Sequence, residues 1–166
     1  MTETAQQPDK ALVQFDCTGH AVGKMRNDLE VHMTQPFAEG PFLMATDEGS
    51  FHGGDASAPP PLALFVAGLT GCIMTQIRAF AKRLKVTIKD LDVETRVIWD
   101  WESKGRVYET GPKSFEIDVL IDSDDPQDKV IALIEAAKKG CFLEQTLGQA
   151  NTIRHRMKTP DGWVDV

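Results

Sequence analysis

Cysteine is the residue type in this sequence whose placement points most directly to chemistry. The 166-residue chain has three, at Cys17, Cys72 and Cys141. They form no CxxC pair and, with the histidines, no cluster of zinc-ligand spacing, and three are too few for a disulfide scaffold of this length. We therefore expect no metal ion and no cofactor. The thiols are either inert packing groups or reactive as thiolates.

The three cysteines are expected in physically different places. Cys72 lies in the middle of a long apolar stretch, which favours core packing and a raised thiol pKa unless a cation or hydrogen-bond donor is close. Cys141 follows Gly140 at the expected start of a helix, where unpaired backbone N–H groups favour a thiolate. Packing at a helix junction is an equal alternative for Cys141. For Cys17, on an alternating apolar strand, we expect core packing.

The first third of the chain has the period of half-buried strands. Strands are expected at three places, 12–18, 29–33 and 36–46. Residues 47–61 then collect glycines and prolines, and a long ordered loop of this kind is often functional. A helix is expected over 62–84, and the prolines at its start are compatible with a first helical turn.

The helix expected over 62–84 is unusually apolar. It has no charged residue before Arg78, and a soluble helix that is apolar on nearly every side must be buried on nearly every side. Its uncharged part, 62–77, is 16 residues long, short of the ~20 needed to span a bilayer. A domain of this size rarely surrounds such a helix alone, so a partner subunit is expected.

The second half of the chain predicts a hairpin followed by helices. Residues 91–101 and 115–121 alternate between apolar and polar, with glycine-containing turn signals between them. Asp124-Asp125-Pro126 predicts an acidic cap for a helix that ends at Gly140. A short helix near Cys141 and a last strand over 150–157 complete an α+β domain.

Composition excludes several classes of protein. A content of 42% hydrophobic and 26% charged residues is that of a folded domain. The net charge of −7, with no basic run longer than a pair, argues against nucleic acid and against a membrane surface as partners. The polar N-terminus lacks the layout of a signal peptide. We expect a disordered tail over 1–10, one domain over 11–166 and a cytoplasmic location.

Two segments that end on cysteines resemble the OsmC/Ohr family, the osmotically inducible protein C and organic hydroperoxide resistance proteins. The first combines short motifs in a fixed order: Asp47-Glu48, Gly53-Gly54-Asp55, Pro59-Pro60-Pro61-Leu62 and Ala67-Gly68-Leu69-Thr70-Gly71-Cys72. The second is Ala136-Ala137-Lys138-Lys139-Gly140-Cys141, followed by Thr146-Leu147. With the order of elements, the resemblance covers about Val13 to Met157.

The resemblance implies a fold and an activity. Family members are intertwined homodimers, with antiparallel sheets around two long central helices, and the best-known ones are thiol peroxidases acting on organic hydroperoxides. By resemblance Cys72 is the peroxidatic cysteine, which becomes a sulfenic acid, and Cys141 the resolving cysteine, which condenses with it to a disulfide. A dithiol reductant then restores both thiols.

The sequence departs from the peroxidases' pattern at three places. They carry a glutamate ten residues before the first cysteine, where this chain has Leu62. They pair it with an arginine expected near 18–20, whereas the nearest candidate here is Arg26. Proline usually follows their second cysteine, and here Phe142 does. The chain thus resembles the broader OsmC-like branch more than the peroxidases proper.

Four residues are possible accessories to the cysteines: Arg26, Glu48, His52 and Glu144. His52 adjoins the Gly53-Gly54 loop, and Glu144 could act as a local acid beside Cys141, although an exposed loop or helix surface is the simpler interpretation of both. The leading hypothesis is reduction of an organic hydroperoxide or other small apolar oxidant. The alternative is a non-catalytic dimer that binds an apolar or thiol-reactive ligand in a pocket between the subunits.

Overall fold

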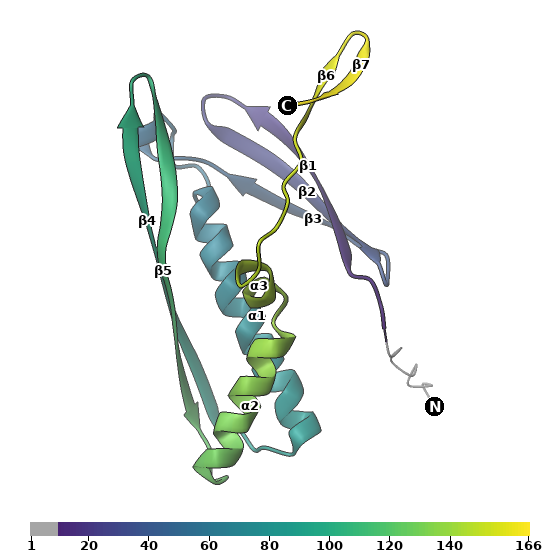
Figure 1. Ribbon diagram of the computed structural model, residues 1–166, viewed down its shortest axis with the longest axis vertical. Coiled ribbons are helices and arrows are strands. Elements are labelled where there is room, and N and C mark those ends of the chain that lie inside the picture. Colours follow the sequence, from purple (N-terminus) through teal and green to yellow (C-terminus); the bar gives the residue numbers. More distant parts are fainter. Residues whose placement is uncertain (1–9) are drawn as a thin grey trace. The chain divides into compact units, whose positions relative to one another are not determined.

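The computed structural model describes residues 10–166, so the predicted tail over 1–10 lies, apart from Lys10, outside the described part of the chain. The fold is α+β, with antiparallel sheets and a long central helix, which confirms the predicted class (Figure 1). The chain divides into two compact units, 1–65 and 66–166.

The first unit contains a three-stranded antiparallel sheet. Its strands, in spatial order, are β1 (Gln14–Val22), β2 (Arg26–Gln35) and β3 (Glu39–Thr46). The β1–β2 ladder runs to the tight turn at 23–25, so both strands are longer than the alternating segments that predict them. β3 begins only at Glu39.

Cys17 is exposed, so the prediction of a core thiol is wrong. All nine residues of β1 are exposed. β1 is an edge strand, and the sheet has no second layer within its own unit. Alternation in a sequence distinguishes the two faces of a strand, but whether either face is covered depends on which element packs there.

The glycine- and proline-rich loop that follows β3 is compact. It contains a short 3₁₀ helix, η1 (Ser50–His52), which ends at Gly53 with φ +79°. Gly54 then lies directly against the Glu48 backbone, where any Cβ would collide with the Glu48 carbonyl oxygen. The two glycines are therefore required for different reasons: Gly53 adopts a left-handed backbone conformation, and Gly54 allows the chain to approach the Glu48 backbone closely.

Helix α1 (Pro61–Leu84) begins at the end of this loop and contributes more buried residues to the core of the second unit than any other element. Its fully buried residues recur every four positions: Leu69, Ile73, Ile77 and Ala81. By length and composition α1 could cross a membrane, and only 17% of its most apolar window is buried within the chain. The predicted burial on nearly every side is therefore not met by this chain alone.

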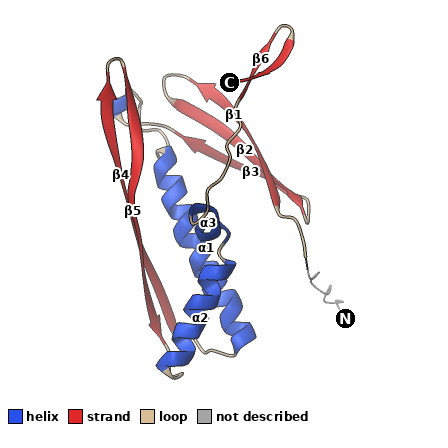
Figure 2. Cartoon of the chain, in the orientation of Figure 1, coloured by secondary structure: helices blue, strands red, loops and turns tan. Residues whose placement is uncertain are grey.

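Strands β4 (Asp90–Lys104) and β5 (Val107–Asp122) form the long hairpin predicted from alternation. Figure 2 shows it beside α1. Half-buried residues of both strands pack on the α1 core: Leu91, Val93, Ile117, Val119 and Ile121. The hydroxyl groups of Thr70 on α1 and Thr95 on β4 lie 2.9 Å apart and fix the helix on the hairpin.

Helices α2 (Gln127–Gly140) and α3 (Phe142–Leu147) complete the core and end close to the predicted positions. The predicted acidic cap of α2 is wrong. Asp125 does not cap the helix but accepts hydrogen bonds from the Thr87 backbone N–H, at 2.7 Å, and from Lys129 Nζ, at 2.6 Å. Its carboxylate therefore holds the α1–β4 connection to the start of α2.

The chain ends in a second hairpin rather than in the single strand predicted over 150–157. Its strands are β6 (Arg156–Thr159) and β7 (Gly162–Asp165). Pro160-Asp161-Gly162 is the turn sequence between them, with Gly162 at φ +133°. The missed signal was this turn, which lies beyond the predicted segment, and of the predicted residues only 156 and 157 belong to a strand.

Substituting Gly54 tests the close packing of the loop. We expect Gly54→Ala to destabilise the protein by about 2–3 kcal/mol, because the new methyl group displaces the Glu48 backbone. Gly49→Ala is the matched control, since Gly49 has an ordinary φ of −75° and open space around its Cβ position. Urea denaturation measures both; equal midpoints for the two variants would contradict the packing described for Gly54.

Candidate functional site

Cys72 and Cys141 meet in the second unit although they are far apart in the sequence. Cys141 is 0% exposed and belongs to the buried core cluster, against which the half-buried Cys72 packs. Both are free thiols, and the Cys72 side chain is near enough to influence the pKa of the Cys141 thiol. The structure thus brings together the two cysteines that the resemblance pairs.

Helical spacing carries Cys141 into this position. Leu133 and Ala137 are fully buried on one side of α2, and Cys141 continues their four-residue spacing just beyond the end of the helix. At Cys141 the backbone turns extended, with φ −76° and ψ 110°, and α3 starts at the next residue. The cysteine therefore lies where two helices meet, and it points into the core.

Gly140 allows α2 to approach α1 at this junction. A Cβ on Gly140 would lie 2.6 Å from Cζ and 2.8 Å from Cε2 of Phe80, closer than a carbon contact permits. Any other residue at this position would push the end of α2 away from α1 or force the Phe80 ring to move. Gly140 thus sets the separation of the helices that carry the two cysteines.

Burial keeps the Cys141 thiol protonated. Loss of solvation raises its pKa from an ordinary 9.0 to about 11, and the neighbouring Cys72 side chain acts in the same direction. The backbone N–H groups of Glu144 and Leu143 lower the pKa, as expected at a helix start, but their effect is smaller. The α3 N-terminus thus favours a Cys141 thiolate as predicted, but burial outweighs it and the pKa of Cys141 is raised overall.

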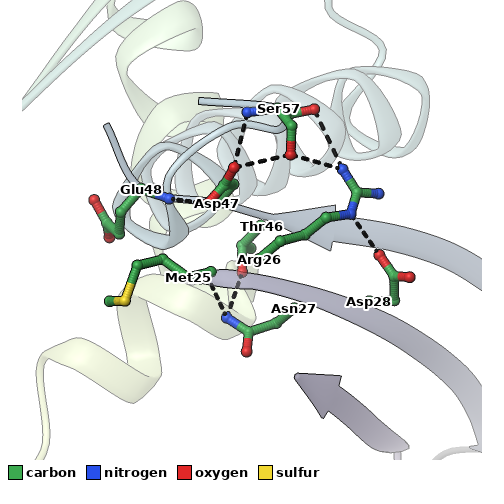
Figure 3. A network of polar contacts seen from close by, with 8 residues as sticks. All are labelled: Met25, Arg26, Asn27, Asp28, Thr46, Asp47, Glu48 and Ser57. Carbon is green, nitrogen blue, oxygen red and sulfur yellow. Dashed lines mark hydrogen bonds and ion pairs between the residues drawn. The ribbon is translucent and has the colours of Figure 1, made fainter. Parts of the chain in front are cut away.

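A separate polar cluster lies in the first unit (Figure 3). Asp47, only 2% exposed, accepts hydrogen bonds from the Ser57 N–H and Oγ–H, at 2.9 and 2.8 Å. These two donors hold the pKa of the Asp47 carboxyl below its ordinary value. The carboxylate also accepts the Glu48 N–H at 2.9 Å. Asp47 thereby closes the loop that leads to α1.

Arg26 joins this cluster from the start of β2. Its Nη1 donates to the carbonyl oxygen and Oγ of Ser57, at 3.3 and 3.1 Å, and its Nε to Asp28 at 2.9 Å. In the described chain, the guanidinium therefore supports the loop 47–61. This contact holds Arg26 to the segment that precedes α1.

Comparison with protein-family models identifies the fold. The model described as OsmC-like protein matches residues 53–156, more than half of the chain, and the match includes both cysteines. The chain belongs to the OsmC family.

Solved OsmC-family structures are similar over most of the chain. An OsmC-like hydroperoxide resistance protein from Jannaschia sp. CCS1 is 69% identical over 93% of this chain and 98% of that chain, with a TM-score of 0.65. An organic hydroperoxide resistance protein from Legionella pneumophila is 22% identical, over 83% and 91%, with a TM-score of 0.58. An OsmC-like protein from Mycoplasma pneumoniae is 18% identical, over 86% and 91%, with a TM-score of 0.63. These last two show the fold alone. No curated protein matches significantly.

Membership in the OsmC family explains the apolar character of α1. The family is soluble, so α1 is the central helix of its fold rather than a membrane span. Among residues 10–166, no group of three or more His, Cys, Asp or Glu side chains could hold a metal ion.

The other predicted accessory residues are dispersed. His52 is exposed and its ring contacts Phe51 edge-on. Glu48 belongs to the loop cluster through its backbone, and its carboxylate points away from Ser57 (Figure 3). Glu144 is half-buried on α3; burial raises the pKa of its carboxyl, Lys138 lowers it and Glu135 raises it. Roles for these residues in the OsmC-family reaction stay predictions.

Sequence reasoning missed three residues that position the site. Ser57 connects Arg26 to Asp47, Gly140 admits the Phe80 ring, and Thr95 fixes α1 through Thr70. Ser57 and Thr95 are common residue types without a distinctive spacing. Gly140 was assigned only as a helix end, and nothing in the sequence shows which ring packs on it.

The protonation of Cys141 can be tested by alkylation. In the native protein at about pH 8, iodoacetamide should modify the exposed Cys17 and leave the Cys141 thiol unmodified. A thiol with a pKa of about 11 is almost wholly protonated at about pH 8 and therefore unreactive. Reactivity of Cys141 should rise only as the pH approaches 11, whereas in denatured protein it should rise near 9. Peptide mass spectrometry follows each cysteine, and equal native rates for Cys17 and Cys141 at pH 8 would refute the assignment.

Proposed function

We propose that this OsmC-family protein reduces organic hydroperoxides in oxidative-stress defence, with Cys72 as the peroxidatic and Cys141 as the resolving cysteine. The observation that carries the proposal is the packing of Cys72 against the buried cluster that contains Cys141. Their unequal burial supports these roles, since an oxidant reaches half-buried Cys72 more easily than Cys141, which is 0% exposed. The 69% identical relative is described as a hydroperoxide resistance protein.

The proposed reaction begins at Cys72. Its thiolate attacks the terminal oxygen of the hydroperoxide, the O–O bond breaks, and the alkoxide leaves and takes a proton to become an alcohol. Cys72 is thereby oxidised to a sulfenic acid. Cys141 belongs to the cluster on which Cys72 packs, so its sulfur can attack that of Cys72, expelling water and forming the disulfide before further oxidation.

A dithiol reductant completes the cycle. Two sulfur atoms of the reductant are oxidised to a disulfide, and its two protons return to Cys72 and Cys141. The balance of one turnover is therefore one hydroperoxide and one dithiol consumed, with one alcohol, one water and one disulfide released.

A second candidate function rests on the departures from the peroxidases' pattern. Leu62 has no carboxylate to pair with an arginine, and Arg26 is hydrogen-bonded to Ser57 and Asp28. Without that pair, the same fold would suit a non-catalytic dimer that binds an apolar or thiol-reactive ligand between its subunits. The two functions differ in one property, which is whether hydroperoxide is consumed catalytically.

The proposal includes a homodimer. Only 17% of the most apolar window of α1 is buried within the chain, and Leu62 near its start is 54% exposed. Exposed apolar surface on this scale marks an interface. We assign the cover to a second copy of the chain and expect the dimer to be cytoplasmic.

Stopped-flow kinetics with cumene hydroperoxide test the peroxidase activity. We expect the wild type to react far faster than free cysteine, and Cys72→Ser to lose about 10³-fold or more because the nucleophile is absent. Cys141→Ser should undergo the first oxidation but fail to turn over with dithiothreitol, and it should accumulate sulfinic acid at Cys72.

Cys17→Ser is the matched control for these variants. It removes an exposed thiol outside the pair and should retain the wild-type rate. A wild-type rate no better than that of free cysteine would reject the peroxidase and favour the ligand-binding dimer.

Light scattering after size-exclusion chromatography tests the dimer. Each chain has a mass of 18.3 kDa, and we expect the eluted species to have twice that mass at micromolar concentration. Cys17→Ser should elute in the same way, since the interface is apolar rather than disulfide-linked. A species of 18.3 kDa would contradict the assignment of α1 to an interface.

A further inference from the structure

We propose that oxidant and reductant reach the cysteine pair by one approach, on the side of α1 that Gly68 leaves open, so that the reducing thiol attacks the Cys72 sulfur and Cys141 is the leaving group. This inference rests on the proposed function and specifies how the oxidised site is reset.

The two sulfur atoms differ in access. Cys141 is 0% exposed and is enclosed by core residues of α1, α2 and α3, including Leu133, Ala137 and Leu143. Cys72 is half-buried and lies on the margin of that cluster. Thiol–disulfide exchange requires a thiolate to approach one sulfur in line with the S–S bond, so access selects the sulfur that is attacked.

Gly68 lies one helical turn before Cys72, on the same side of α1. A cysteine on a helix directs its side chain over the preceding turn, which at this position is the turn of Gly68 and the fully buried Leu69. Gly68 is exposed, and a Cβ there would meet only Leu143 Cδ1, at 3.6 Å. The turn of α1 over which the Cys72 side chain lies therefore has no side chain of its own at residue 68, which leaves room for an approach to Cys72.

The exchange balances with Cys141 as leaving group. The reductant's thiolate forms a bond to Cys72 Sγ, and the electron pair of the broken S–S bond goes to Cys141 Sγ, which takes a proton. The reductant's second thiolate then attacks its own sulfur in the mixed disulfide, which releases Cys72 and forms a cyclic disulfide.

Leaving-group strength opposes this regiochemistry only weakly. Burial raises the pKa of Cys141 from 9.0 to about 11, which slows its departure on the order of tenfold. That pKa of about 11 already includes the N–H groups of Leu143 and Glu144, which favour the departing thiolate. The complete burial of Cys141 Sγ, which the reductant would otherwise have to attack, has the larger effect on which sulfur reacts.

Trapping the mixed disulfide tests the regiochemistry independently of peroxidase activity. Cys17→Ser protein is oxidised with diamide, treated briefly with the monothiol 2-mercaptoethanol, quenched with acid and alkylated with N-ethylmaleimide. We expect the mercaptoethanol adduct on Cys72 and the maleimide on Cys141. The reverse labelling, or failure of diamide to link the two cysteines, would overturn the proposal, whereas an absent peroxidase activity would overturn only the proposed function.

A pair of glycine variants tests the approach itself. Gly68→Ala and Gly71→Ala each replace an exposed glycine of α1, and the new methyl group fits in both cases. Residue 68 lies one helical turn before Cys72, whereas residue 71 is its neighbour in sequence and points to a different side of the helix. We expect Gly68→Ala to slow dithiothreitol reduction of the diamide-formed disulfide severalfold, Gly68→Val to slow it about tenfold or more, and Gly71→Ala to change it less than twofold. Circular dichroism confirms folding. Equal rates for Gly68→Val and Gly71→Ala would refute the role of Gly68.

Discussion

The burial of Cys141 against Cys72 is the interaction on which the site depends. It joins three helices at one point, because Cys72 belongs to α1 while Cys141 lies between α2 and α3. Burial of one partner and partial exposure of the other give two chemically similar thiols different properties. Burial raises the pKa of Cys141 to about 11, whereas Cys72 lies at the margin of the core. The proposed division of labour follows from this asymmetry.

Close approach at glycine is the structural device that supports this arrangement. Gly140 admits the Phe80 ring at the α1–α2 junction, and Gly54 brings the loop onto the Glu48 backbone before α1 begins. In the first unit the Asp47–Ser57–Arg26 hydrogen bonds hold the same loop. In each of the two units, a glycine therefore allows a close contact that a larger side chain would prevent.

The sequence was informative where local pattern determines structure. Alternation predicted the β4–β5 hairpin, and helix signals placed the ends of α1 and α2 closely. It failed where the outcome depends on neighbours. Cys17 lies on a strand with an apolar pattern but is exposed, because no second layer covers its sheet within the first unit. Asp125 accepts hydrogen bonds from Thr87 and Lys129 and does not cap its own helix. At Cys141 the helix start was recognised, but the stronger effect of burial on the thiol pKa depends on tertiary packing.

The central claim is that Cys72 and Cys141 act as one redox pair, and the most direct test is the product of a single oxidation. Cys17→Ser protein is treated with one equivalent of cumene hydroperoxide, alkylated under denaturing conditions and mapped by mass spectrometry. The account predicts a Cys72–Cys141 disulfide within one chain, with neither cysteine alkylated. Sulfinic acid at Cys72 beside an alkylated Cys141, or no oxidation of either thiol, would contradict it.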